Sequence, residues 1–161
     1  ISISFFICII GFIDDRINLN PSVKVLFIII PSAYLILNGI SIYDLGDYEY
    51  IGILSLGKFQ LPFLILSTGL LINATNYIDG VDGLLLTFFI CCLGYYIFLI
   101  DETNTIYLLK ILLVPVVLNL IMNLLPYKSK IKIFSGNTGS LFIGFFISFL
   151  TIELYNSFSI H

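Results

Sequence analysis

Three polar clusters interrupt a chain that is otherwise strongly apolar. Residues 11–16 read Gly-Phe-Ile-Asp-Asp-Arg, residues 73–84 read Asn-Ala-Thr-Asn-Tyr-Ile-Asp-Gly-Val-Asp-Gly-Leu, and residues 134–140 read Phe-Ser-Gly-Asn-Thr-Gly-Ser. Carboxylate and amide oxygens suit Mg²⁺ and Mn²⁺, which proteins usually hold with one or two side chains and substrate phosphates. The clusters therefore predict a metal site that takes an anionic substrate such as a nucleoside diphosphate.

The spacing within the first two clusters predicts how their side chains point. Asp14 and Asp15 are consecutive, so on a helix they point about 100° apart and would serve different neighbours. Asp79 and Asp82 are three residues apart and can lie on one helical face. Asn73 and Asn76 would extend that face into a column of polar groups along one cleft.

The third cluster lies just before an apolar run that begins at Leu141. The turn from Gly136 to Ser140 would therefore precede a helix, and its backbone N–H groups would point toward the cleft. Helix N-termini and tight turns bind phosphate oxygens in this way. The third cluster thus predicts a phosphate-binding element.

The elements that carry these clusters are predicted to cross a membrane. The chain has 161 residues, of which 59% are hydrophobic and 11% are charged, and its mean hydropathy is +1.09. So few charged and polar residues cannot cover the surface of a water-soluble globular protein of this length. The apolar runs are continuous, as in spanning helices, and do not alternate as in barrel strands. We expect an all-α, polytopic transmembrane helix bundle that forms one domain over residues 1–161.

About five full spans are expected, together with a partial leading one. The partial span covers residues 1–13, which is shorter than the roughly 20 residues that cross a bilayer. Since the first residue is Ile1, we expect a fragment truncated at both ends. A short hairpin is predicted at residues 51–57. The full spans are predicted at residues 23–40, 59–76, 84–100, 107–125 and 141–155.

Counting these spans predicts that the three clusters lie on one side of the membrane. Two spans separate Asp15 from Asp79, and two more separate Asp82 from Asn137. Cytoplasmic loops carry an excess of Lys and Arg, and the shared face would hold most of the basic residues. That face is therefore predicted to be cytoplasmic. Its basic residues are Arg16, Lys24, Lys128, Lys130 and Lys132, against Lys58 and Lys110 on the other side.

The three clusters resemble the signatures of the polyprenyl-phosphate N-acetylhexosamine-1-phosphate transferases of glycosyltransferase family 4. The resemblance covers nearly the whole chain in order and spacing, and residues 73–84 match the most specific signature. The family includes enzymes that begin the synthesis of enterobacterial common antigen, O-antigen and teichoic acid, and the phospho-N-acetylmuramoyl-pentapeptide transferase of peptidoglycan synthesis. The resemblance implies a multi-pass enzyme of the bacterial inner membrane.

The resemblance also implies a reaction and a role for each cluster. A UDP-activated N-acetylhexosamine and undecaprenyl phosphate, a polyprenyl phosphate, would give the lipid-diphosphate sugar and UMP, with Mg²⁺ or Mn²⁺ as cofactor. Asp14 and Asp15 would be the catalytic pair at the lipid-phosphate end, one of them a base or orienting group. The other implied roles are nucleotide-sugar binding for Asn73, Asp79, Asp82 and Phe134, which would stack on uracil, and metal binding for Asn76 and Asn137.

Two departures from the family pattern bear on activity. Asn137 stands where the family usually has a metal-binding Asp. An amide keeps a carbonyl ligand but loses the negative charge, so weaker metal affinity is expected. A His-containing cytoplasmic loop of the family would follow the end of this chain. We therefore expect the isolated chain to be inactive.

Two other functions are alternatives to the transferase. One is a noncatalytic relative of the same family, marked by Asn137. The other is a cation or proton transporter that uses the carboxylates of the first two clusters. The opposite half of the membrane offers no matching relay beyond Glu153, which argues against transport. No basic patch indicates nucleic acid binding. The sequence leaves open which N-acetylhexosamine is used, and whether the protein forms a homodimer.

Overall fold

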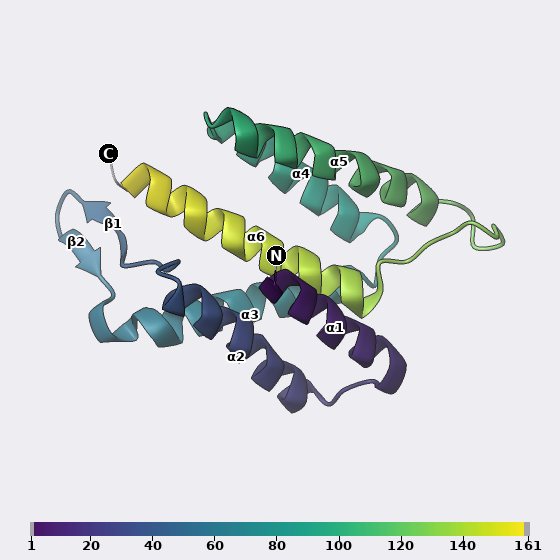
Figure 1. Cartoon of the computed structure of the whole chain (residues 1–161), viewed down its shortest axis with the longest axis horizontal. Helices are drawn as coiled ribbons and strands as arrows, with labels where there is room; N and C mark the ends of the chain where they lie inside the picture. Colours follow the sequence, from purple (N-terminus) through teal and green to yellow (C-terminus); the bar gives the residue numbers. More distant parts are fainter. Residues whose placement is uncertain (1, 160–161) are drawn as a thin grey trace.

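The computed structural model describes residues 2–159, apart from the side chains at positions 2, 21, 22, 25, 28, 158 and 159. Within these residues six helices form a bundle, and a two-stranded hairpin lies at one end (Figure 1). The predicted all-α class is confirmed. The elements in chain order are α1 (Ser2–Ile17), α2 (Pro21–Leu37), β1 (Asp44–Tyr48), β2 (Gly52–Ser55), the 3₁₀ turn η1 (Gly57–Phe59), α3 (Gln60–Ile78), α4 (Leu84–Leu99), α5 (Thr103–Asn123) and α6 (Gly136–Ser159).

The helices form where the apolar runs are longest. In the described part of the chain, three segments are long and apolar enough to cross a membrane: Gly57–Ile78, Thr103–Asn123 and Gly136–Ser157. The apolar helices α2 and α4 have 17 and 16 residues, fewer than the roughly 20 that a perpendicular span needs. The protein is thus a helical membrane protein, and the number of its spans remains a prediction.

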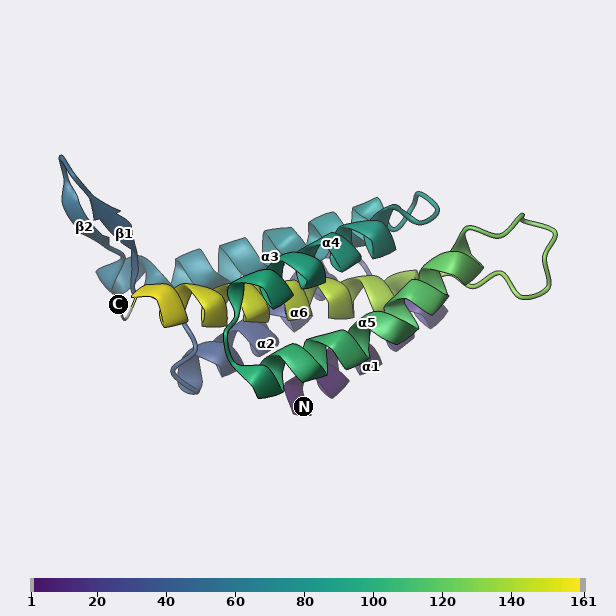
Figure 2. The same cartoon turned by 90° about the horizontal axis from the view of Figure 1, so that it is seen from above.

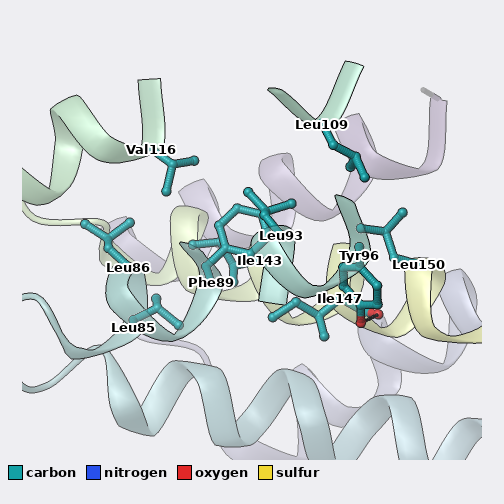
Figure 3. Close-up of a cluster of buried hydrophobic side chains, with 10 residues drawn as sticks. All are labelled: Leu85, Leu86, Phe89, Leu93, Tyr96, Leu109, Val116, Ile143, Ile147 and Leu150. Carbon is teal, nitrogen blue, oxygen red and sulfur yellow. Dashed lines mark hydrogen bonds between the residues drawn. The ribbon is translucent and has the colours of Figure 1, made fainter. Parts of the chain in front are cut away.

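Helix α6 is the centre of the bundle, because it packs against α1, α3 and α4. One of its faces contributes Ile143, Ile147 and Leu150 to a core shared with α4 and α5, which Figure 3 shows in close-up. Another face contributes to a second core, shared with α1, α2 and α3. The buried residues of that second core are Ile7, Ile10, Leu35, Leu64, Ile72, Leu141, Phe145 and Ile152.

A glycine sets the close packing of α3 on α6. A Cβ atom added at Gly144 would lie 2.7 Å from Ile72 Cα and would also run into the Thr75 hydroxyl. Atoms cannot approach so closely, so a larger residue would push the two helices apart. The missing side chain at Gly144 therefore brings the last turns of α3 beside the first turns of α6.

The three polar clusters lie at the same end of the bundle. The connections α1–α2, α3–α4 and α5–α6 gather there, whereas the hairpin and the end of α6 lie at the opposite end (Figures 1 and 2). This arrangement confirms the expectation, drawn from span counting, that the clusters share one end.

The predicted hairpin exists, but it begins earlier in the chain. Strand β1 pairs antiparallel with β2, and Tyr48 is opposite Gly52. The prediction covered the second strand and missed β1, whose Asp44 and Gly46 are poor strand formers. The Tyr155 hydroxyl donates a 2.6 Å hydrogen bond to Asp44 Oδ1 and so joins the hairpin to α6.

Candidate active site

Asp14 holds the turn between α1 and α2. Its side chain is fully buried. Oδ2 lies 2.6 Å from the Lys24 ammonium, and Oδ1 accepts a 2.8 Å hydrogen bond from the Leu19 backbone N–H. A buried carboxylate needs such a counter-charge, because an unpaired one is costly to remove from water. Asp14 thus faces α2 and not α6.

Asp15 faces the first turn of α6, so the predicted divergence of the two carboxylates is confirmed. Its Oδ1 accepts a 2.8 Å hydrogen bond from the Asn137 backbone N–H. Its Oδ2 accepts hydrogen bonds from the Thr138 backbone N–H at 3.1 Å and from the Thr138 hydroxyl at 2.8 Å. The backbone N–H groups predicted to receive phosphate therefore donate to a carboxylate of the chain itself.

Asn76 joins α3 to the same turn of α6. Its Nδ2 donates to Asn137 Oδ1 at 2.6 Å and to Ser140 Oγ at 2.9 Å. The neighbouring Thr75 hydroxyl donates to the Ser140 carbonyl oxygen at 3.0 Å. The two residues predicted to bind metal, Asn76 and Asn137, are thus in direct contact.

Asp79 approaches the start of α6 from the end of α3. Burial raises the pKa of its carboxyl above the usual range, and the negative charge of Asp15 raises it further. The Ser135 hydroxyl and the Gly136 backbone N–H lie beside the carboxylate and act in the opposite direction. Asp15 and Asp79 therefore converge on the turn at residues 135–138.

Asp82 does not share a helical face with Asp79, contrary to the prediction. Helix α3 ends at Ile78, and Gly83, with φ of +74°, reverses the chain into α4. Asp82 is instead paired with Lys132, whose Nζ lies 2.6 Å from its Oδ2. The same ammonium lies 5.1 Å from the centre of the Phe134 ring. Lys132 thus connects two residues predicted to bind the nucleotide.

Asn73 is half-buried on α3, one turn before Asn76. Its side chain makes no hydrogen bond or ion pair with any other residue that the structure describes. The structure therefore brings together Asp15, Asn76, Asp79 and Asn137, while Asp14 lies behind them against α2 and Asp82 lies with Phe134.

Comparison with known proteins identifies the family. The family model described as Glycosyl transferase family 4 matches residues 1–155. The chain belongs to glycosyl transferase family 4. No solved structure matches it.

Curated relatives of this glycosyl transferase family 4 chain carry transferase names. It is 30% identical over 160 residues to the probable undecaprenyl-phosphate N-acetylglucosaminyl 1-phosphate transferase of Bacillus subtilis, a match that covers 96% of this chain and 43% of the relative. It is 31% identical to the phospho-N-acetylmuramoyl-pentapeptide-transferase of Streptococcus suis, over 91% of this chain and 46% of the relative. It is 24% identical to the undecaprenyl-phosphate alpha-N-acetylglucosaminyl 1-phosphate transferase of Escherichia coli O157:H7, over 89% of this chain and 40% of the relative. The chain thus spans less than half the length of these relatives.

Sequence reasoning missed Asn123, which organises the part of this family 4 site that holds Asp82 and Phe134. Its side chain is buried at the end of α5. Oδ1 accepts a 2.5 Å hydrogen bond from the Gly83 backbone N–H, and Nδ2 donates to the Ile133 carbonyl oxygen at 2.9 Å. An amide at the end of an apolar helix, four residues after Asn119, was the available signal. Asn123 fixes the positions of Asp82 and Phe134 by holding their neighbours.

The donor chemistry at the start of α6 fits a hard cation. Among the described residues, no three His, Cys, Asp or Glu side chains form a group that would hold a metal alone. However, Mg²⁺ usually keeps several waters and needs only one or two carboxylates together with substrate phosphates. Asn76 and Asn137 would hold it through carbonyl oxygens, and Asp79 would supply negative charge. The ammonium groups of Lys24 and Lys132 are paired with Asp14 and Asp82. They therefore do not neutralise the carboxylate of Asp79, which stays available to a cation.

Proposed function

We propose that the protein transfers a sugar-1-phosphate from a UDP-N-acetylhexosamine to a polyprenyl phosphate such as undecaprenyl phosphate. An oxygen of the lipid phosphate attacks the β-phosphorus of the nucleotide sugar. The bond from that phosphorus to the bridging oxygen breaks, and UMP leaves. The product is a polyprenyl diphosphate that carries the sugar, as a bacterium needs to begin an envelope polysaccharide or peptidoglycan.

One observation carries this proposal: three segments far apart in the chain meet at the first turn of α6. Asp15 of α1 binds the backbone of Asn137 and Thr138, and Asn76 of α3 binds the Asn137 side chain. These segments hold the three family signatures, so the residues of the motifs are neighbours in space. The name of the Bacillus subtilis relative supports transfer of a sugar 1-phosphate to a lipid phosphate, and the name of the Streptococcus suis relative supports transfer of a phosphosugar.

Each part of the site has a proposed role. Asp14 and Asp15 lie at the lipid-phosphate end. Asn73, Asp79 and Asp82 hold the nucleotide sugar, and the exposed ring of Phe134 stacks on uracil. Asn76 and Asn137 bind the metal. Mg²⁺, when bound, neutralises the diphosphate and the departing UMP. The side chains themselves hold the two phosphates in line, since positioning and fixed charge supply most of the catalysis in such transfers.

The proposed location is the cytoplasmic face of the bacterial inner membrane. The end of the bundle that carries the three clusters, with the adjoining helix ends, holds five of the seven basic residues, as expected for a cytoplasmic face. A nucleotide sugar is available on that side. The lipid phosphate would enter from the bilayer at the same end of the helices.

The experiment that tests this function measures UMP release. Membranes with the full-length protein are supplied with UDP-N-acetylglucosamine, Mg²⁺ and undecaprenyl phosphate. We expect UMP to form only when both the lipid and the metal are present. If no N-acetylhexosamine donor gives UMP although the protein binds uridine nucleotides, the transferase proposal is wrong.

A noncatalytic relative is the second candidate, and Asn137 favours it. Its Oδ1 already accepts a hydrogen bond from Asn76, and it carries no charge to attract a cation. Such a protein would bind a uridine nucleotide without releasing UMP from its sugar. A cation transporter has less support, because the carboxylates of the motifs gather at one end of the bundle and do not form a path along it.

A further inference from the structure

We propose that Asp15 is a positioning residue, which caps α6 and orients Asn137, and that it is not the base of the transfer. This inference rests on the proposed function and assigns a part to one member of the carboxylate pair. The base or orienting role at the lipid phosphate then belongs to other groups at that end of the site.

The hydrogen bonds of Asp15 carry this inference. A carboxylate has about four lone-pair positions, and Asp15 uses three of them on α6. Two of the donors are the backbone N–H groups of Asn137 and Thr138, which have no partner within the helix because they belong to its first turn. An Asp side chain that accepts from such groups is a helix cap. Here the cap comes from another helix, 122 residues earlier in the chain.

A glycine in each of the two segments, Gly136 at the start of α6 and Gly11 on α1, makes room for this contact. Gly136 has a φ of +62°, and a Cβ added there would lie 3.1 Å from Asp15 Oδ2. Gly11 lies one turn before Asp15 on α1. A Cβ at that position would run into Thr138 Cα and would lie 2.8 Å from the Thr138 nitrogen. Both glycines thus allow α1 to approach the first turn of α6 closely enough for a direct cap.

The cap determines where Asn137 lies. Its backbone N–H is held by Asp15, while its side-chain Oδ1 is held by Asn76. Removing the first contact frees the first turn of α6 to shift or fray, and the amide then leaves the candidate metal site. Asp15 therefore acts through Asn137 rather than on the lipid phosphate.

Two substitutions separate a cap from a base. An Asn side chain can keep part of this cap, because its single carbonyl oxygen can still accept from α6, but it cannot take up a proton as a carboxylate does. An Ala side chain can neither accept these hydrogen bonds nor take up a proton. We expect Asp15→Asn in the full-length protein to keep the UMP release rate within about tenfold of wild type. We expect Asp15→Ala to lose about 100-fold, since a displacement of about 1 Å in a site can cost that much.

The opposite pattern overturns the inference. If Asp15 is the base, Asp15→Asn and Asp15→Ala lose activity equally, in the range of about 10²–10⁴-fold for general-base catalysis. A folded Asp15→Asn protein with such a loss contradicts the cap. If Asp15→Ala fails to fold while Asp15→Asn folds and releases UMP, the cap is supported.

A second measurement does not depend on activity. Thermal unfolding in detergent and Mn²⁺ binding by electron paramagnetic resonance are compared for the same variants. The cap predicts a lower unfolding temperature and weaker Mn²⁺ binding for Asp15→Ala, with Asp15→Asn between Asp15→Ala and wild type. Equal values for Ala and Asn contradict it. If the wild-type protein releases no UMP, the proposed function fails, while this comparison still decides whether Asp15 caps α6.

Discussion

Asn76 of α3 donates a 2.6 Å hydrogen bond to the side-chain oxygen of Asn137 at the start of α6. Two uncharged amides thus stand at the position proposed for the metal. Asn76 also donates to Ser140, so its nitrogen faces α6. This contact explains how the site can keep its shape with Asn at position 137. The amide oxygen of Asn137 accepts the hydrogen bond from Asn76 that a carboxylate at the same position would accept.

Asn137→Asp is predicted to strengthen metal binding without disturbing the fold. Asn76 can donate to a carboxylate, and such a charge-assisted bond is stronger than a neutral one. Ligand charge also sets cation affinity. We expect Mn²⁺ to bind roughly tenfold more tightly to Asn137→Asp than to wild type, as measured by electron paramagnetic resonance. Asn104→Asp, at an exposed position in the first turn of α5, is the control for added charge alone. Equal Mn²⁺ affinity in Asn137→Asp and wild type would show that residue 137 is not a ligand.

Gly144→Ala is predicted to separate α3 from α6. The new methyl group would lie 2.7 Å from Ile72 Cα, so the helices must move apart. Overpacking of this kind costs about 1–3 kcal/mol. Thermal unfolding in detergent should show a fall of about 2–4 °C for each kcal/mol.

The matched control for this substitution is Gly94→Ala on α4. No atom lies within 4 Å of a Cβ at that position. We expect an unchanged or slightly higher unfolding temperature, since Ala favours a helix over Gly by about 1 kcal/mol. If both alanine variants unfold at the same temperature, the close packing of α3 on α6 does not carry the stability assigned to it.

Lys24→Met is predicted to destabilise the protein, because it leaves the buried Asp14 carboxylate without its cation. Removal of one partner of a buried ion pair costs about 3–5 kcal/mol. The Lys24 side chain is 21% exposed, so we expect a value in the lower part of that range. Thermal unfolding measures the loss, and Lys128→Met, at an exposed position with no ion pair in the described structure, is the control.

A double variant tests the cause of that loss. In Asp14→Asn with Lys24→Met, no buried charge remains, and the amide can still accept the Leu19 N–H. The double variant should unfold at a higher temperature than Lys24→Met alone. A lower unfolding temperature for the double variant would rule out the buried charge as the source of the instability.

Phe134→Ala is predicted to weaken the binding of uridine nucleotides. The ring is 55% exposed at the end of the bundle that holds the three clusters. Stacking of a base on an aromatic side chain contributes about 1–3 kcal/mol, or roughly 5–150-fold in affinity. Titration calorimetry with UMP measures the change, and Phe134→Tyr should bind like wild type. Phe98→Ala, an exposed position near the opposite end of α4, is the control. Wild-type affinity in Phe134→Ala would exclude the stacking role.

The sequence predicted the convergence of the clusters because span counting depends only on the apolar runs. It also predicted that Asp14 and Asp15 diverge, since consecutive helical residues must do so. The contacts of Asp14 with Lys24 and of Asp15 with Asn137 confirm both expectations. These features are local or topological, so a single sequence is enough to find them.

The features that were missed depend on packing between distant segments. Asp79 and Asp82 were predicted to share a helical face. They do not, because α3 ends before Asp79 and Gly83 turns the chain into α4. The N–H groups of Asn137 and Thr138 were predicted to be available for phosphate, and Asp15 accepts from both. That contact depends on the close approach of α1 to α6 at Gly11, which no local pattern reveals.

The most direct test of the account follows the β-phosphorus of the nucleotide sugar. Membranes containing the full-length protein and undecaprenyl phosphate are given UDP-N-acetylglucosamine labelled with ³²P at either the α- or the β-phosphate. Transfer of a sugar-1-phosphate places the β-label in the lipid extract and leaves the α-label in UMP. If the β-label stays in water-soluble UDP while the sugar enters the lipid, or if neither enters it with any N-acetylhexosamine donor, the account is contradicted.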